Sequence, residues 1–223
     1  MFPLRDHNPS QKTPFVTWLI IALNAGVFFL ELAAPDTEVF INNYALTPGT
    51  VHLSNPLSLL PFLTSMFLHG GWLHILSNMW FLWIFGDNIE AALGHFKYLG
   101  FYLVSGLVAA AVQFAVDPIS RIPVLGASGA IAGVLGGYLV LFPNAKIETL
   151  VTTFGGFFTR VNVPASLMLI YWFITQLFSG VGTVAAGVTD QGGVAFFAHI
   201  GGFAAGWLIA RLVKPTLDWV RIE

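Results

Sequence analysis

The stretch VLGASGAIAGVLGGY, from Val124 to Tyr138, decides how this sequence folds. It is almost wholly apolar and rich in glycine, and it holds one hydroxyl, Ser128. Small residues in such a run let helix backbones approach closely in a lipid environment. The lone hydroxyl therefore needs a partner from elsewhere in the chain.

The composition indicates an integral membrane protein. The chain has 223 residues, of which 56% are hydrophobic and 9% are charged, against about a quarter charged in soluble domains. A formal net charge of -2 argues against nucleic-acid binding, which requires a clustered basic surface. The absence of cysteine excludes disulfides, thiolate metal sites and cysteine nucleophiles. No cofactor is expected.

Six apolar runs predict an all-α polytopic membrane protein with six transmembrane helices, because each approaches the roughly 20 residues that span a bilayer. Their continuous apolar character disfavours a β-barrel. The predicted parts are a segment 1–14, a six-helix domain 15–213 and a tail 214–223. A loop at about 33–69 is apolar and broken by Pro56 and Pro61, so we expect it to associate with the membrane. The runs are Phe15–Leu32, Gly70–Phe85, Tyr98–Val116, Leu125–Phe142, Pro164–Gly182 and Val194–Val213.

Basic residues predict the orientation, because loops rich in lysine and arginine stay in the cytoplasm. In a six-helix arrangement, Arg121 alone falls on the outer side. Both termini are therefore expected to be cytoplasmic, and the second, fourth and sixth helices to run inward. The basic residues on the inner side are Arg5, Lys12, Lys97, Lys146, Arg160, Arg211, Lys214 and Arg221.

Few polar residues occur within the apolar runs, and such residues are functional candidates because burying them in a membrane is costly. His74 and Asn78 lie on the second predicted helix, Ser128 on the fourth and His199 on the sixth. The orientation places all of them at a similar depth, near the outer face.

Two stripes of small residues predict which helices touch. Ser128 precedes the first stripe and His199 lies at the start of the second, so close packing would bring the hydroxyl and the imidazole together. These groups suit nucleophilic acyl transfer, with Ser128 as nucleophile and His199 as general base and acid. Neither helix carries a carboxylate, so the prediction is a Ser-His dyad. The stripes are Gly129, Gly133 and Gly137, and Ala198, Gly202 and Gly206.

An oxyanion intermediate requires hydrogen-bond donors. His74 and Asn78 are four residues apart and share a helix face, and the backbone N–H of Ser128 is expected in a first helical turn, without an intrahelical partner. Taken singly, each of these polar residues is more often structural, and only their combination favours catalysis. Glu90 lies far from the serine and is expected to be structural. The histidines are too few for a zinc site, so no metal is predicted.

At these residues the sequence resembles the rhomboid family of intramembrane serine proteases. The motifs are HILSN, FGDNIEAALG, GASG and AHIGGFAAG, with RDHNP near the amino terminus. The resemblance implies the same roles for Ser128, His199, His74 and Asn78. It also implies a single-pass membrane protein as substrate, cleaved in or near its transmembrane segment. One departure is Ala132, where the family often has an aromatic residue packed on the histidine. Phe196 or Trp172 could orient His199 instead.

Two other functions compete with proteolysis. A catalytically inactive rhomboid-like protein that binds membrane clients would typically lack the serine or the histidine, and this chain has both. A small transporter would usually show broken helices in repeated halves and charges at the midplane, which are not found. The compact sequence suggests a prokaryotic protein of the bacterial cytoplasmic membrane.

Overall fold

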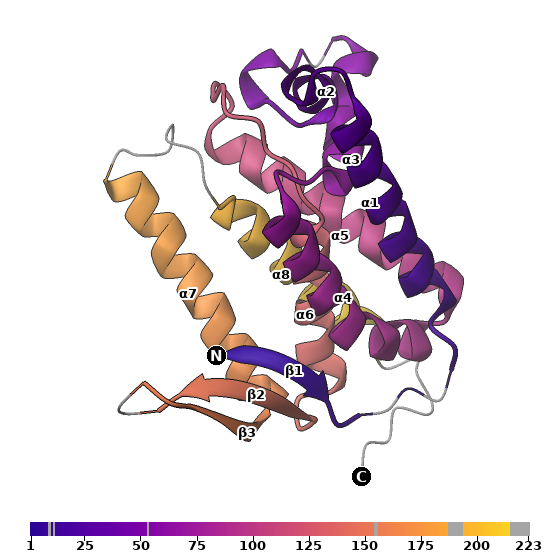
Figure 1. The fold of residues 1–223 in the computed structure, drawn as a ribbon, viewed down its shortest axis with the longest axis vertical. Coiled ribbons are helices and arrows are strands. Elements are labelled where there is room, and N and C mark those ends of the chain that lie inside the picture. Colours follow the sequence, from indigo (N-terminus) through magenta and orange to yellow (C-terminus); the bar gives the residue numbers. More distant parts are fainter. Residues whose placement is uncertain (9, 11, 53, 154–155, 187–193, 215–223) are drawn as a thin grey trace.

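The computed structural model describes residues 1–223 except 9, 11, 53, 154–155, 187–193 and 215–223. A bundle of helices carries a small sheet at one end (Figure 1). A helix forms at each of the six predicted runs, and the predicted tail beyond Lys214 lies outside the described residues. The helices are α1 Phe15–Ala33, α4 Trp72–Leu93, α5 His95–Val116, α6 Ser128–Leu141, α7 Ala165–Ala185 and α8 Phe196–Val213.

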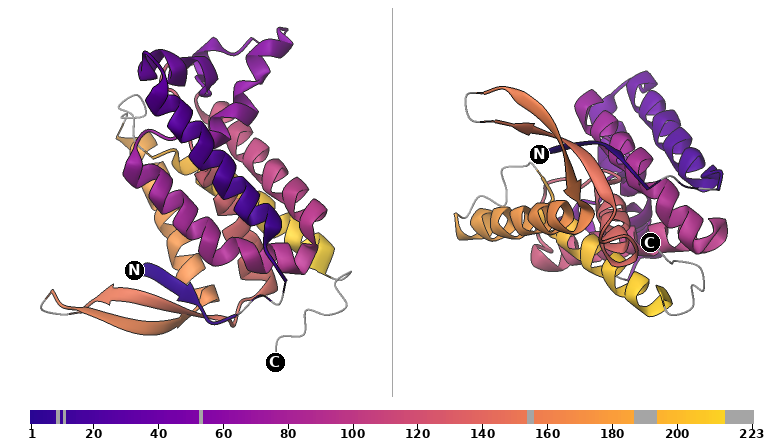
Figure 2. Two further views of the ribbon diagram at one scale, coloured as in Figure 1. Left: turned by 45° about the vertical axis from the view of Figure 1, so that its right-hand side comes forward. Right: turned by 90° about the horizontal axis from the view of Figure 1, so that it is seen from below.

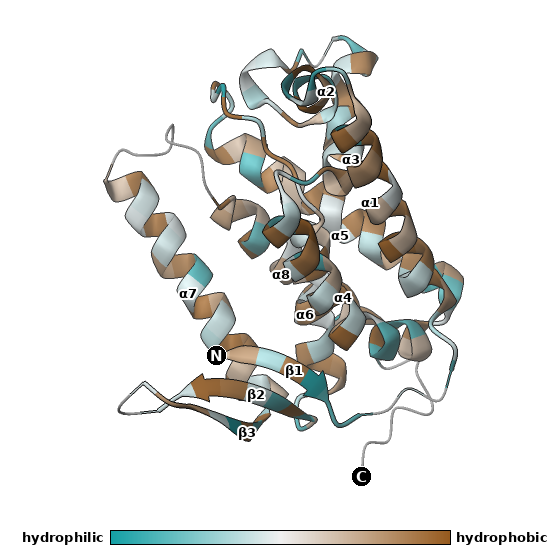
Figure 3. Cartoon of the chain, viewed as in Figure 1, coloured by the Kyte–Doolittle hydropathy of each residue, from teal (hydrophilic) through white to brown (hydrophobic). Residues whose placement is uncertain are grey.

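Four of these helices, α1, α5, α7 and α8, are long and apolar enough to cross a membrane. A fifth candidate arises if α4 is joined to the segment Pro56–Phe67, which meets it at a bend of 78°. Helix α6 has only 14 residues. Hydrophilic residues gather toward the ends of the bundle, near β1 and in the loops, while the helices are largely apolar (Figure 3). The chain is thus a multi-pass membrane protein, and the six spans and their orientation remain predictions.

Helix α6 lies in the core, which explains how so short a helix fits a membrane protein. It contacts α4, α5, α7 and α8 (Figures 1 and 2). Its residues from Gly129 to Tyr138 are all buried. A helix surrounded by protein need not match the thickness of the hydrocarbon layer, because irregular backbone beyond its ends is tolerated where it is buried in protein or lines a cavity.

The segment between α1 and α4 forms short helical pieces instead of an open loop. Several of its apolar side chains remain exposed, among them Leu57 and Leu60. Their exposure is the pattern expected of a membrane-associated segment, and that association stays a prediction. The pieces are α2 Thr37–Tyr44, η1 Pro48–Thr50, η2 Pro56–Leu59, α3 Pro61–Thr64 and η3 Ser65–Phe67.

A three-stranded antiparallel sheet corrects the all-α prediction. Strand β1, Phe2–Asp6, pairs with β2, Lys146–Thr152, which pairs with β3, Phe158–Pro164. The Glu148 carboxylate accepts a hydrogen bond from Arg5 at 2.6 Å and one from Arg160 at 3.3 Å. The sheet lies at the end of the bundle where α7 begins (Figure 1). It ties the amino-terminal residues, predicted as a separate segment 1–14, to the connection between α6 and α7.

Candidate active site

Ser128 is the first residue of α6, and Gly126 sets its position. Gly126 has a φ of 123°, a conformation that favours glycine. A Cβ there would also lie 2.7 Å from Nε2 of His74. The helix therefore begins at Ser128, about a turn later than the expected start at Leu125, and the backbone N–H of Ser128 is one of those that no intrahelical carbonyl can satisfy.

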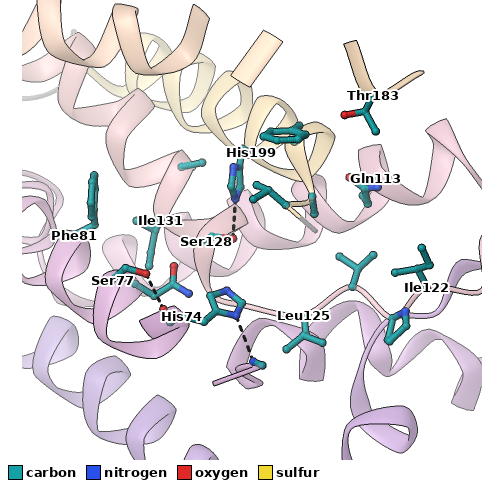
Figure 4. Close-up of a pocket in the computed structure, with 18 of the residues that line it drawn as sticks. His74, Ser77, Phe81, Gln113, Ile122, Leu125, Ser128, Ile131, Thr183 and His199 are labelled. Carbon is teal, nitrogen blue, oxygen red and sulfur yellow. Dashed lines mark hydrogen bonds between the residues drawn. The ribbon is translucent and has the colours of Figure 1, made fainter. Parts of the chain in front are cut away.

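Close packing of α6 against α8 brings a histidine to this serine. Nε2 of His199 lies 2.8 Å from Oγ of Ser128 (Figure 4). The two backbones approach so closely that only glycine fits between them. A Cβ on Gly202 would overlap the carbonyl of Gly129, and one on Gly206 would overlap that of Gly133. His199 lies in the first turn of α8, which begins at Phe196, two residues after the predicted start at Val194.

The two predicted stripes need one correction. Gly137 does not face α8, since a Cβ there would lie 2.9 Å from the ring of Phe101 in α5. Gly136 takes that place, because its Cβ would overlap the backbone carbonyl of Phe203 in α8. A strict spacing of four residues drifts around a helix of 3.6 residues per turn. Two turns beyond Ser128, the residue that contacts α8 is therefore Gly136 and not Gly137.

His74 presents a donor toward the serine. The backbone N–H of Gly70 donates to Nδ1 of His74 at 3.3 Å, so this nitrogen is an acceptor and the neutral ring carries its proton on Nε2. Nε2 points toward Gly126, beside Ser128 (Figure 4). Asn78 is buried, and within the described chain its Nδ2 has no hydrogen-bond partner. Both side chains line the cavity that holds the Ser128 hydroxyl.

A cavity of about 700 Å³ contains these groups. Its wall combines polar side chains with apolar ones from α4, α6 and α7, and Figure 4 shows Phe81 and Ile131 on one side of the dyad and Gln113 on the other. Such a cavity can hold an extended peptide segment and admit water to the serine. The polar lining residues near the dyad are His74, Ser77, Asn78, Gln113 and Ser128.

Two residues of α7 complete the surroundings of His199. The indole of Trp172 packs against the imidazole, with ring centroids 5.7 Å apart and planes inclined by 34°. Trp172 was one of the two candidates for this contact. Gln176, which the sequence analysis missed, places Oε1 2.8 Å from Nδ1 of His199. A signal for it existed, because a glutamine one turn after Trp172 interrupts an apolar run.

Glu90 is buried far from the dyad and holds the start of α1. Its carboxylate accepts hydrogen bonds from the backbone N–H groups of Val16 and Thr17, both at 2.7 Å, and from the Thr17 hydroxyl. His95 lies 2.5 Å from the same carboxylate. Glu90 thus caps the first turn of α1 and joins it to the end of α4. Within the described part of the chain, no three histidine or acidic residues are grouped so as to hold a metal.

The helices and the cavity define a multi-pass membrane protein with a serine and a histidine hydrogen-bonded inside the bundle. Residues 56–216 match the family model described as the Rhomboid domain. The chain therefore belongs to the rhomboid family.

Named relatives come from several kingdoms. The chain is 34% identical over 161 residues to RHOMBOID-like protein 4 of Arabidopsis thaliana, an alignment covering 71% of this chain and 35% of that protein. It is 27% identical to the mitochondrial Rhomboid protein 1 of Saccharomyces cerevisiae, over 89% of this chain and 54% of the relative. It is 33% identical to the putative rhomboid protease YdcA of Bacillus subtilis, over 60% of this chain and 66% of the relative. The chain thus spans between about a third and two thirds of these relatives.

Proposed function

We propose that this protein is an intramembrane serine endopeptidase. The observation that carries the proposal is the hydrogen bond of 2.8 Å between Ser128 and His199 inside a cavity of the bundle. Membership of the rhomboid family supports an intramembrane protease or a rhomboid-like protein. The presence of both Ser128 and His199 favours the protease over a protein that only binds membrane clients.

The reaction has two steps. Ser128 Oγ attacks the carbonyl carbon of the scissile peptide bond while its proton passes to Nε2 of His199. The tetrahedral intermediate collapses, the C–N bond breaks, and the leaving amine takes the proton from His199. Water then attacks the acyl-enzyme with His199 again as base, which releases the acid product and restores the serine.

The oxyanion is stabilised by three donors in this proposal. They are the Nε2–H of His74, the amide of Asn78 and the backbone N–H of Ser128. Three observations support these roles. Nε2 of His74 faces Gly126, two residues before Ser128. Nδ2 of Asn78 is buried and has no partner among the described residues, and Ser128 is the first residue of α6. Each such donor typically contributes about 10²- to 10³-fold in rate.

The substrate in this proposal is a single-pass membrane protein, cut in or near its transmembrane segment. The chain forms one membrane domain over 15–213 with six spans and both termini in the cytoplasm, and we assign it to a bacterial cytoplasmic membrane. The distribution of the basic residues supports this orientation. The dyad then lies near the outer face, where water can enter the cavity.

The test is cleavage of a generic single-pass substrate by the purified protein in detergent. Wild type should cleave, and Ser128→Ala and His199→Ala should each lose activity while keeping the thermal stability of wild type within a few degrees. A fluorophosphonate probe should label wild type at Ser128 and leave both variants unlabelled. If wild type cleaves none of several substrates and the probe does not label Ser128, the client-binding function is favoured instead.

A further inference from the structure

His199 has a second polar partner, which comes from a helix outside the predicted pair. Its Nδ1 lies 2.8 Å from Oε1 of Gln176 in α7. The histidine is 9% exposed, and Gln176 is half-buried. In a serine protease triad, a carboxylate occupies this position on the imidazole. Here an amide occupies it.

The hydrogen bonds around Gln176 run in one direction, and this direction fixes the proton on His199. The hydroxyl of Thr175 donates to the carbonyl of Trp172 at 2.6 Å. Having used its single proton there, that hydroxyl can only accept from Nε2 of Gln176, which lies 3.4 Å away. The amide therefore turns its oxygen toward His199.

An amide oxygen only accepts hydrogen bonds, so Nδ1 of His199 must carry the proton. In the neutral ring, Nε2 is then unprotonated and faces the hydroxyl of Ser128 at 2.8 Å. This is the tautomer that a general base requires. The chain of donors runs from Ser128 through His199 and Gln176 to Thr175, and hydrogen bonds aligned in one direction polarise one another favourably.

We infer that Gln176 is a positioning residue that completes a Ser128–His199–Gln176 relay. It holds the imidazole in the Nδ1–H tautomer, while Trp172 packs against the ring. The inference rests on the proposed peptidase function and adds a third member to the predicted dyad. A neutral amide orients the ring, and it offsets the charge of an imidazolium less than a carboxylate would.

The expected effect of losing this contact lies between two limits. A neutral hydrogen bond alone corresponds to a factor of roughly 3 to 10, and the wrong tautomer in a serine protease triad costs about 10⁴ in kcat. Gln176→Leu should therefore lower kcat by about 10- to 100-fold with little change in KM. Gln176→Glu restores an acceptor oxygen and should recover most of the lost rate.

The experiment measures tautomer and turnover on the same proteins. Side-chain ¹⁵N resonances of histidine-labelled protein in micelles report which nitrogen of His199 is protonated, with the resonance assigned by its loss in His199→Ala. Wild type and Gln176→Glu should show the Nδ1–H form, and Gln176→Leu a mixture of forms. Leu177→Ala changes the exposed neighbour on α7 and serves as the control, which should match wild type.

Two outcomes would overturn the inference. One is an Nε2–H tautomer in wild type. The other is a Gln176→Leu variant with unchanged tautomer, whether or not its turnover falls. The tautomer measurement needs no substrate, so it separates the two proposals: a wild type that shows the expected tautomers but neither cleaves nor labels would contradict the peptidase function and still support the contact.

Discussion

Replacing Gly206 by alanine should separate the two helices that carry the dyad. A Cβ at Gly206 would overlap the carbonyl of Gly133 and lie 2.6 Å from its Cα. Both partners are helix backbone, so no flexible side chain can yield. The helices must move apart by about 1.4 Å, the difference between the 2.0 Å to the Gly133 carbonyl oxygen and the 3.4 Å at which ordinary contact begins.

This separation has a cost at the dyad although Gly206 lies two turns from His199. The Oγ–Nε2 distance of 2.8 Å would approach or exceed 3.5 Å if α8 moved as a rigid body, which is beyond a useful hydrogen bond. A misplacement of about 1 Å can lower a rate by about 10². Overpacking of a core also lowers stability, typically by about 1 to 3 kcal/mol.

The assay compares kcat on a single-pass substrate, the rate of fluorophosphonate labelling of Ser128, and the thermal midpoint. Gly206→Ala should lose about 100-fold in kcat and label more slowly, with a lower midpoint. Gly100→Ala in α5 is the matched control, because a Cβ there meets nothing within 4 Å. The reasoning would be refuted by a Gly206→Ala protein that cleaves and labels as fast as Gly100→Ala.

Three further predictions test other parts of the structure. Asn78→Leu should lower kcat by about 10²- to 10³-fold with the thermal midpoint kept, because it removes one oxyanion donor; unchanged turnover would remove Asn78 from the proposed site. Glu90→Ala should lower the free energy of unfolding by about 2 to 4 kcal/mol, because it leaves the N–H groups of the first turn of α1 without their cap; thermal denaturation measures this, and a midpoint equal to wild type would contradict it. Burial raises the pKa of Asp6 to about 6, so the folded protein binds this proton more tightly than the unfolded chain and stability should fall as pH rises from about 4 to about 6. Asp6→Asn should make this dependence shallower, and parallel curves of thermal midpoint against pH for both proteins would count against the assignment.

The sequence indicated much of the candidate site because the constraints on it are local. Ser128 and His199 each lie next to small residues within an apolar run, and a polar group in such a run needs a partner. The stripes of small residues then identify the neighbouring helix. Spacing alone could not show that Gly137 turns toward α5 and Gly136 toward α8, because a drift of part of a turn decides which neighbour a residue meets.

The features that the sequence did not reveal depend on pairing between distant segments. The strands β2 and β3 occupy a connection between two helices, and their third partner, β1, lies about 140 residues earlier in the chain. Gln176 is similar, because its significance comes from the approach of α7 to α8. A glutamine on a largely apolar helix signals a contact, and the partner appears only when the helices are placed together.

The dyad lies where the amino-terminal ends of three helices meet, and this position suits acyl transfer. His74, Ser128 and His199 all lie within the first turn of their helices, α4, α6 and α8. The amino-terminal end of a helix carries a partial positive charge from its free N–H groups. Three such ends meeting at one cavity favour negative charge there, and the charge that develops during attack by Ser128 is the oxyanion. A site near the middle of the same helices would have the same side chains without this field, so the position of the dyad at the helix ends is itself part of the proposed mechanism.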